Sequence, residues 1–507
     1  MKIPPPFFLL CIAALAQPLL ADVIPNTLFS DNAVLQQQRP VPVWGTAADG
    51  EKVTVEFAGQ KVETVATNGN WSVTLQPLTA TASPQTMSIR GSNTVTLTNL
   101  LIGEVWICSG QSNMERQLGL RDGQKPIVNW EAEAASANYP EIRSFHVKPA
   151  ISANPIASPT GSWAVCSPTT VTNFTAVGYY FGRDLYKNLK VPIGLIHSSL
   201  GGTPAEAWTR NEVLATNPVL APMLDKQAKA IASYPERLAK YQAEEPKLKA
   251  AYTNACAIAL AAAKPSPRPP SPPQDPLTDS HAPSVLYNGM INPLLPYAMR
   301  GVIWYQGEAN GGRAKEYQTL FPSMIADWRT QWEQGDFPFL FVQLAPFFKM
   351  GPEIREAQFL TLKKTPNTAM TVITDHGDAQ DIHPTEKEPV GARLALAARA
   401  LAYGQTIEYS GPLYESARVD GSSMILSFTH VGKGLVAKDG SLKGFTVAGA
   451  DKVFIPADAV IKESSVVVSN PQVTSPVAVR YGWTNAPDVN LFNAEGLPAS
   501  PFRTDTE

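Results

Sequence analysis

The sequence predicts an α/β domain flanked by two all-β domains. In the middle of the chain, short apolar runs typical of buried strands alternate with amphipathic stretches, whereas before and after it polar and apolar residues alternate with a period of two. The chain has 507 residues, a length that corresponds to about three domains. Its composition, 44% hydrophobic and 17% charged, is that of a globular protein. Its formal charge of −3 offers no positive field to nucleic acid phosphates, so we expect no nucleic acid partner.

Residues 1–21 have the layout of a secretory signal peptide. Lys2 precedes an apolar stretch from Phe7 to Leu20, which ends in small residues at Ala21. The alternative, a membrane anchor, is disfavoured because the stretch is shorter than the roughly 20 residues needed to cross a bilayer and is interrupted by Pro18. We therefore expect cleavage after Ala21, no membrane span in the remaining chain, and a secreted or periplasmic protein.

The cysteines and the short motifs exclude several classes. Cleavage removes Cys11 and leaves Cys108, Cys166 and Cys256, an odd set in which at most one intramolecular disulfide can form. The sequence contains no Cys-x-x-Cys pair, no His-Glu-x-x-His and no glycine-rich phosphate loop. We therefore expect no metal site and no cofactor.

Residues 22–100 are predicted to form a small β-sandwich-like domain. Strand-type runs occur at 53–57, 62–65 and 71–75, and Asn68-Gly69 is a hairpin turn signal between the last two.

Residues 101–410 are predicted to form the α/β domain. Buried strands are expected at 104–108, 191–196, 301–305, 339–343 and 369–373, and helices at 177–189, 317–332 and 387–401. This alternation predicts a mostly parallel sheet with helices on both faces.

An insertion and a second β domain complete the chain. The insertion, at about 211–283, favours exposed helix up to residue 263 and then a stiff proline-rich connector at 264–276, with a partner-binding proline motif as the alternative. Residues 411–507 return to the period of two, with strands expected at 424–428, 452–455, 465–468 and 477–480.

A polar cluster follows the first buried strand, in Cys108-Ser-Gly-Gln-Ser-Asn-Met114. The carboxyl ends of strands form the ligand crevice in open α/β sheets. Ser112, on a tight turn eased by Gly110, is therefore a candidate nucleophile whose backbone N–H also faces a bound carbonyl. A structural alternative is a helix cap, because Ser112 and Glu115 have the capping-box spacing.

A serine nucleophile needs a base, and His383 is the best-placed histidine. It lies in Asp378-Ala-Gln-Asp-Ile-His-Pro384, between a predicted strand and a predicted helix. Asp381 and Asp378 are both close enough in sequence to orient the imidazole. The alternative is an ordinary surface-loop histidine.

Two further strand-end clusters supply donors for an oxyanion. Asn310 ends Trp304-Tyr-Gln-Gly-Glu-Ala-Asn310, and Gly201-Gly202 follows the strand at 191–196. An Asn amide and backbone N–H groups at Ser112 and at a glycine are the donors that acyl transfer requires.

Taken together, these motifs resemble the SGNH hydrolases and, within them, the sialate O-acetylesterases. The resemblance rests on Gly110-Gln-Ser-Asn-Met114, Ser199–Trp208, Trp304–Asn310 and Asp381-Ile-His-Pro384, and it extends to 288–293, 338–344, 490–498 and 501–505. It implies an SGNH-type, flavodoxin-like three-layer catalytic domain. It also implies Ser112 as nucleophile, His383 as general base, and Gly201, Asn310 and the Ser112 N–H as oxyanion donors.

One position departs from the pattern of many SGNH hydrolases, which place the acid three residues before the histidine. That position is Gln380 here. Asp381 is our first choice for the acid and Asp378 our second. The sequence leaves two more arrangements open, in which a backbone carbonyl orients the ring or the histidine has no acid.

The resemblance implies a serine esterase that hydrolyses O-acetyl esters of sialic acids and releases acetate through an acetyl-enzyme. An acetyl xylan or other polysaccharide O-acetylesterase is the first alternative, and a non-catalytic glycan-binding protein the second. A sialic acid site should contain an arginine for the carboxylate, with Arg116 and Arg313 as candidates. Trp106, Trp208 and Trp304 are candidates for sugar stacking, although core packing is the favoured role for each.

Overall fold

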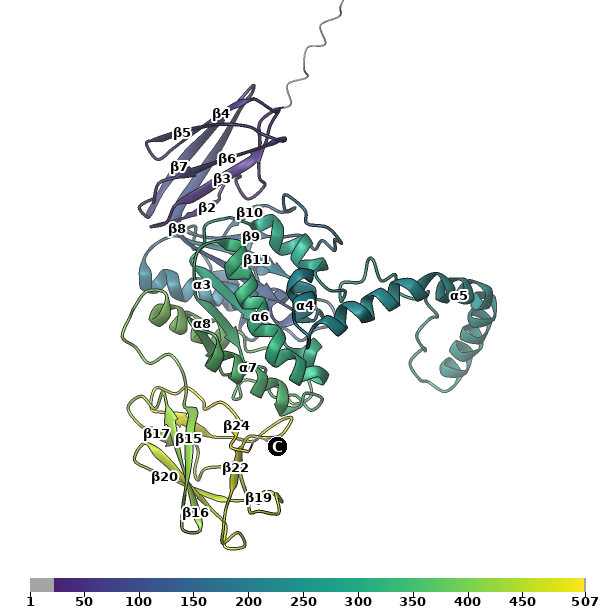
Figure 1. Ribbon diagram of the computed structural model, residues 1–507, viewed down its shortest axis with the longest axis vertical. Helices are drawn as coiled ribbons and strands as arrows, with labels where there is room; N and C mark the ends of the chain where they lie inside the picture. The colour runs from purple at the N-terminus through teal and green to yellow at the C-terminus, as the bar shows by residue number, and fades with distance from the viewer. Residues whose placement is uncertain (1–21, 506–507) are drawn as a thin grey trace, which may run out of the picture.

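The computed structural model describes residues 22–505, so the predicted signal peptide at residues 1–21 lies outside the described part (Figure 1). The protein is of mixed α/β class, with one large mixed sheet and additional all-β sheets. Figure 1 shows β-strands at one end of the long axis, helices and strands in the middle, and a second group of strands at the other end. Within residues 22–505, no helix has the length and apolar character needed to cross a membrane.

The central sheet has the strand order β10-β9-β11-β8-β12-β13-β14. All neighbours pair in parallel except β10, which is antiparallel to β9. All five strands predicted in this region are confirmed, whereas β9 and β10 were not foreseen. The bounds are β8 Thr94–Gly110, β9 Ile142–His146, β10 Trp163–Val165, β11 Ile193–Ser199, β12 Gly301–Tyr305, β13 Phe339–Val342 and β14 Thr368–Thr371.

Strand β8 joins the N-terminal strands to the central sheet. Its first part pairs with β7 (Thr81–Arg90) and β2 (Val34–Gln36), and its last part lies between β11 and β12. The strand therefore runs through residue 100, where the sequence suggested a boundary. From β8 the chain first builds β9 and β11 on one side and then β12 to β14 on the other. The end of β8 is thus the point at which the strand order reverses, where open α/β sheets bind ligands.

Two pairs of helices pack in this domain. Helix α3 (Ala176–Leu189) packs against α8 (Glu388–Leu401), and α6 (Ala314–Trp332) packs against α7 (Pro352–Lys364). The helices predicted at 177–189, 317–332 and 387–401 are confirmed to within three residues. The remaining helical segments of this domain are α1 Ser112–Glu115, α2 Trp130–Ser136, η1 Val171–Asn173, η2 Ala205–Trp208, η3 Tyr287–Ile291, η4 Asn292–Leu294 and η5 Glu308–Arg313.

The N-terminal strands differ from the sequence prediction in one pairing. Asn68 and Gly69 form the predicted turn, with φ of 53° and 75°. The strands on its two sides nevertheless enter different sheets, because β5 pairs with β4 and β6 pairs with β3. The bounds are β1 Ile24–Pro25, β3 Val41–Thr46, β4 Lys52–Phe57, β5 Gln60–Val65 and β6 Asn70–Leu75.

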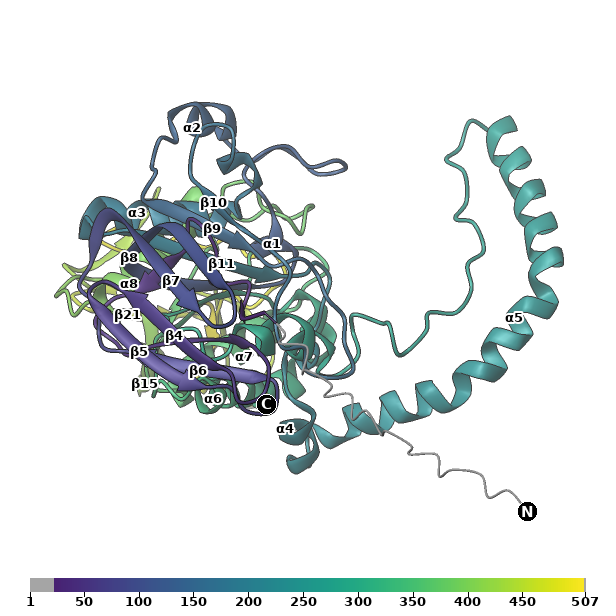
Figure 2. The same cartoon turned by 90° about the horizontal axis from the view of Figure 1, so that it is seen from above.

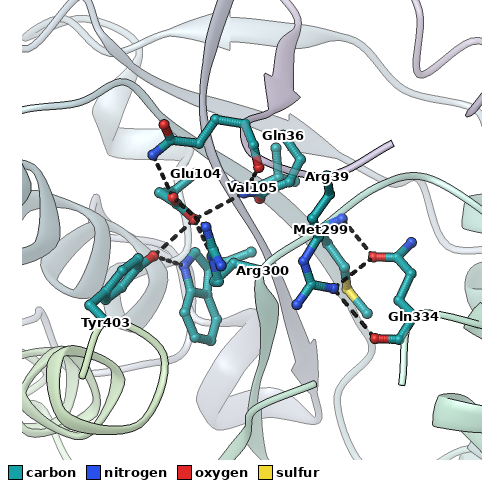
Figure 3. Close-up of polar contacts among 10 residues, drawn as sticks. Gln36, Arg39, Glu104, Val105, Met299, Arg300, Gln334 and Tyr403 are labelled. Carbon is teal, nitrogen blue, oxygen red and sulfur yellow. Dashed lines mark hydrogen bonds and ion pairs between the residues drawn. The ribbon is translucent and has the colours of Figure 1, made fainter. Parts of the chain in front are cut away.

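A buried ion pair lies where β8 enters the central sheet (Figure 3). The Glu104 carboxylate, 1% exposed, accepts two hydrogen bonds from Arg300, at 2.7 and 2.9 Å, and further bonds from Gln36 and Tyr403. Buried charges are tolerated when they are paired and fully hydrogen-bonded. The network therefore ties the N-terminal strands to β8 and to the segment that follows α8 (Glu388–Leu401) in one arrangement.

The insertion forms a helical arm. Helices α4 (Asn211–Thr216) and α5 (Ala221–Ala261) lead away from the domain, and the proline-rich segment brings the chain back. Figure 2 shows α5 and the returning segment standing away from the rest of the molecule. The exposed helix expected there is confirmed, and α5 continues through Pro235 and Pro246.

The C-terminal strands form three small sheets. The strands predicted at 424–428, 465–468 and 477–480 are confirmed, but the one at 452–455 is wrong except at Ile455. Lys452 closes a turn onto Gly449 with φ of 58°, a conformation that a strand cannot accommodate. The bounds are β15 Leu413–Asp420, β16 Ser423–Thr429, β17 Leu435–Ala437, β18 Phe445–Ala448, β19 Ile455–Pro456, β20 Asp458–Lys462, β21 Ser465–Ser469, β22 Ala478–Tyr481, β23 Leu491–Asn493 and β24 Phe502–Arg503.

The candidate tryptophans lie in the core, and the cysteines within residues 22–505 form no disulfide. Trp106, Trp208 and Trp304 are fully buried, which confirms the favoured core-packing role. The three cysteines within residues 22–505 are all free thiols.

Candidate active site

The end of β8 places Ser112 at the rim of the central sheet. Gly110 adopts φ of 137°, and a Cβ there would lie 2.2 Å from the Tyr305 carbonyl oxygen, so only glycine fits between β8 and β12. The chain then turns, and Ser112 becomes the first residue of the one-turn helix α1. The N-cap is Gln111 and no side chain caps this helix, so Ser112 does not act as a cap.

The structure brings Ser112 and His383 together across 271 residues of chain. His383 Nε2 lies 2.9 Å from Ser112 Oγ, which is a hydrogen-bonding distance. Both side chains line a cavity of about 540 Å³ at the carboxyl ends of the strands. A neutral imidazole in this position can accept the serine proton.

The surroundings of His383 keep it neutral. Burial lowers the pKa of His383, and the positive charge of Lys387 lowers it further. The Asp381 carboxylate acts in the opposite direction, and Arg121 and Arg116 contribute smaller lowering effects. The unprotonated base is therefore available at a lower pH than for an unperturbed histidine.

The two candidate acids lie differently with respect to the imidazole. Asp381 Oδ1 is 3.8 Å from His383 Nδ1, too long for a hydrogen bond, and it accepts one from the His383 backbone N–H at 2.9 Å. Asp378 pairs with Lys125 at 2.6 Å and accepts from the Gln380 backbone. Asp381 is thus the carboxylate beside the ring, and Asp378 is held by its own partners.

Asn113, next to the nucleophile, connects three separate segments. Its Nδ2 donates to Glu308 Oε1 at 2.6 Å and to the Ile382 carbonyl at 3.0 Å, and its Oδ1 accepts from Lys387 Nζ at 2.5 Å. Ile382 directly precedes His383. The Asn113 amide therefore links the nucleophile turn to the histidine loop, to η5 and to the residue that precedes α8.

The groups bonded to Asn113 are buried and ionisable. Burial lowers the pKa of Lys387 to about 7, partly offset by Glu308, and burial raises the pKa of Glu308. The Lys387 ammonium also lies 5.2 Å from the centre of the Tyr305 ring. The network gives each charge a polar or aromatic partner within the sheet edge.

Gly201 lies directly against the nucleophile. A Cβ at Gly201 would approach Ser112 Cβ to 3.3 Å and Glu115 Oε2 to 2.9 Å, so a glycine keeps the backbone close to Ser112. On the opposite wall, Gln111 Oε1 accepts from the backbone N–H groups of Gly307 and Ala309. Gln111, Gly201 and Ala309 all line the cavity.

Asn310 is near this region but does not line the cavity. Its Nδ2 donates to Glu206 Oε2 at 3.0 Å, and its Oδ1 accepts from the Ala205 N–H and from Gln306. The side chain is 1% exposed. Its amide thus holds η2 against η5.

The two arginines suggested for a sugar carboxylate lie outside the cavity. Arg116 is 1% exposed and donates to the carbonyls of Gln117, Gly119 and Lys125, at 3.0, 2.9 and 3.1 Å. Arg313 pairs with Glu206 and Glu316. Both guanidinium groups therefore interact with groups of the protein itself.

Sequence reasoning missed Asn113, Glu308 and Lys387 as parts of this site. Asn113 and Glu308 belong to the same sequence motifs as Ser112 and Asn310, and this neighbourhood in sequence could have identified them as site residues. Lys387 gave none, because a lysine at the start of an amphipathic helix is normally solvated.

Comparisons with known proteins place the chain in a family. The family model described as carbohydrate esterase, sialic acid-specific acetylesterase matches residues 102–251 and 279–400. The sialate O-acetylesterase of Rattus norvegicus is 31% identical, with 94% of this chain and 93% of that protein covered, and the one from Homo sapiens is 29% identical, with 94% and 91% covered.

A solved structure gives the same result for the fold. The crystal structure of a carbohydrate acetylesterase from Xanthomonas citri superimposes with a TM-score of 0.80 at 35% identity, covering 96% of this chain and all of that one. The chain therefore belongs to the carbohydrate esterase family of sialic acid-specific acetylesterases and is a carboxylic ester hydrolase.

Proposed function

We propose that this protein is a serine esterase that hydrolyses O-acetyl esters of sialic acids. The observation that carries the mechanism is the 2.9 Å contact between Ser112 Oγ and His383 Nε2 in a cavity at the strand ends. The substrate class rests on the family and on the sialate O-acetylesterases that the chain resembles over 94% of its length.

The reaction proceeds in two acyl-transfer steps. His383 Nε2 takes the Ser112 hydroxyl proton as Oγ attacks the acetyl carbonyl carbon, and the carbonyl π electrons move to its oxygen. When the tetrahedral intermediate collapses, the bond to the sugar oxygen breaks and His383 returns the proton to that oxygen. Water, deprotonated by His383, then attacks the acetyl carbon of acetyl-Ser112. When this second intermediate collapses, the bond to Oγ breaks, His383 returns the proton to Oγ, and the acetic acid formed ionises to acetate.

Backbone groups stabilise the negative oxygen of each intermediate. Ser112 opens α1, so its N–H has no acceptor within the helix and is available to the substrate. Gly201 lies close to Ser112, and this supports the backbone N–H of Gly201 as the second donor. The resemblance also implies Asn310 as a donor. Its Nδ2 donates to Glu206 Oε2 here, so this role requires the amide to exchange that partner for the oxyanion.

Two finer features belong to the same proposal. The parallel sheet with its order reversal at β8 supports an SGNH-type, flavodoxin-like domain. The apolar stretch Phe7 to Leu20 supports secretion or a periplasmic location after cleavage at Ala21, and N-terminal sequencing of the exported protein tests this.

Acetate release from O-acetylated sialic acid and from acetyl xylan tests the function. We expect release from the sialic acid, with a loss of at least about 1,000-fold in both Ser112→Ala and His383→Ala. Ser422→Ala and His281→Ala change exposed residues that do not line the cavity and serve as matched controls. Release from xylan alone would move the substrate class to neutral polysaccharides. No release from either substrate would overturn the esterase.

A further inference from the structure

The wall of the Ser112 cavity contains a positively charged side chain that the mechanism does not use. Among the described residues, Arg121 is the only arginine or lysine that lines this cavity. Its side chain is 37% exposed, and one terminal nitrogen, Nη1, lies 3.0 Å from Glu115 Oε2. A guanidinium has five N–H donors, so this pair leaves donors for a ligand.

The loop that carries Arg121 is held firmly. The buried Arg116 donates to three of its carbonyl groups, and the Gln124 N–H closes a turn onto the Arg121 carbonyl at 3.2 Å. Glu115, on α1, orients the Arg121 guanidinium. The charge thus has a defined position next to Ser112, which reduces the entropy lost when a ligand binds.

The same cavity also has acceptors without protein partners. In the described part of the chain, Gln124 Oε1 and Glu308 Oε2 are buried and accept no hydrogen bond, and both residues line the cavity. Both oxygens are closed to solvent in this conformation, whereas the two residues as a whole are partly exposed. The wall therefore offers a bound molecule one cationic donor flanked by two polar side chains.

This set of groups matches an acidic sugar better than a neutral one. A sialic acid has a carboxylate for the guanidinium, and hydroxyl and amide groups for the polar side chains beside it. An acetylated xylose residue has hydroxyl groups but no anion, so the guanidinium donors that Glu115 leaves free would gain no charged partner from it.

We propose that Arg121 binds the carboxylate of the substrate and makes the enzyme prefer acetylated sialic acids to neutral acetylated sugars. The proposal rests on the esterase function of Ser112 and His383 and names the residue that determines its substrate class. Arg121 is a binding residue: it contacts the acid group of the sugar and takes no part in proton transfer. Its positive charge also helps to lower the pKa of His383, which is consistent with a site that attracts anions.

Matched substrates separate recognition of the carboxylate from any other role of Arg121. The probes are O-acetylated N-acetylneuraminic acid and the same compound with its carboxylate blocked as a methyl ester. The measured quantity is the ratio of kcat/KM for the free acid to kcat/KM for the methyl ester. A change in folding or in the pKa of His383 alters both values together and leaves the ratio unchanged.

We expect Arg121→Gln to lower this ratio by about 10- to 100-fold, mainly through KM for the free acid, because a hydrogen bond to a charged group contributes this much. Arg121→Lys keeps the charge but not the fork of donors, so it should restore part of the ratio. Arg268→Gln removes the same charge from the exposed proline-rich segment and should leave the ratio at the wild-type value.

Three results would overturn the proposal. A ratio near 1 in the wild type would show that the enzyme does not recognise the carboxylate. A wild-type ratio that Arg121→Gln leaves unchanged would assign the recognition to another residue. If the wild type hydrolyses neither compound, the proposed function fails and this inference with it, an outcome that is distinct from the other two.

Discussion

Asn113, beside the nucleophile, bonds to three separate segments through one amide, whereas Asp381, beside the histidine, lies 3.8 Å from the ring. Asp381 also shares its carboxylate with the His383 backbone N–H and with Lys125 at 3.7 Å. The nucleophile side, Ser112 and Asn113, is therefore held by short, buried hydrogen bonds. The acid side, Asp381 and its partners, is held by longer, partly exposed contacts. Buried hydrogen bonds in a low dielectric position groups more strongly than exposed ion pairs do.

We infer from this difference that the Asn113 amide, more than the Asp381 carboxylate, sets the geometry between Ser112 and His383. In a serine triad the acid fixes the ring by a direct hydrogen bond to Nδ1. Here the Asn113 amide holds the Ile382 carbonyl, one residue before His383, and so positions the histidine loop through its backbone. Three substitutions test this comparison.

Removing the amide should have the largest effect. We expect Asn113→Ala to lower kcat by about 100-fold with little change in KM, because a shift of about 1 Å between reacting groups has this effect. The free energy of unfolding should fall by about 1–3 kcal/mol, since Lys387 and Glu308 lose a buried partner. Steady-state kinetics and denaturant unfolding measure both.

Asn188→Ala, on the exposed surface of α3, is the matched control for this change. A kcat within threefold of the wild type in Asn113→Ala would contradict the positioning role.

The buried partner of Asn113 should make stability depend on pH. Lys387 has a folded-state pKa of about 7, below the value of about 10.4 for an exposed lysine. Between these values the unfolded chain binds more protons than the folded one, so the contribution of Lys387 to stability rises with pH. Below about pH 7 both states are protonated and the full destabilisation remains.

Lys387→Met removes this dependence. From pH 7 to pH 10 the free energy of unfolding of the wild type should gain a few kcal/mol that the variant does not gain, because each pKa unit corresponds to about 1.4 kcal/mol. The stability of the variant relative to the wild type should therefore fall over this range. Urea titrations of both proteins across this range provide the measurement. A constant difference would mean that Lys387 is solvated in the folded protein.

Weakening the acid side should have the smallest effect. We expect Asp381→Asn to lower kcat/KM by about 10-fold or less, compared with about 10⁴-fold for the acid of a tightly bonded triad. Because the Asp381 carboxylate raises the pKa of His383, its removal should move the acidic limb of the pH–rate profile to lower pH.

Asp378→Asn is the matched control, since Asp378 pairs with Lys125 and not with the ring, and it should stay within about twofold of the wild type. A loss of 1,000-fold in Asp381→Asn would reverse the comparison and make the acid the main positioning group.

Much of the fold followed from local patterns. The apolar runs that became β8, β11, β12, β13 and β14 are buried on both faces, and their composition reflects this directly. Strands β9 and β10 were missed because Ile142–His146 is interrupted by Arg143 and Ser144, whose burial depends on partners elsewhere, such as Asn99. Arg143 is 3% exposed in the structure.

The alternation of strands and helices, and the positions of Ser112 and His383 at strand ends, could be predicted from local patterns, because hydrophobic periodicity and the rule of strand carboxyl ends are local properties. Which side chains meet could not be predicted in this way. The contacts of Asn113 with Glu308 and Lys387 span 195 and 274 residues, and the Asn310 contact with Glu206 spans 104. Such contacts depend on the register of parallel strands and on the packing of the loops that follow them, which no local pattern specifies.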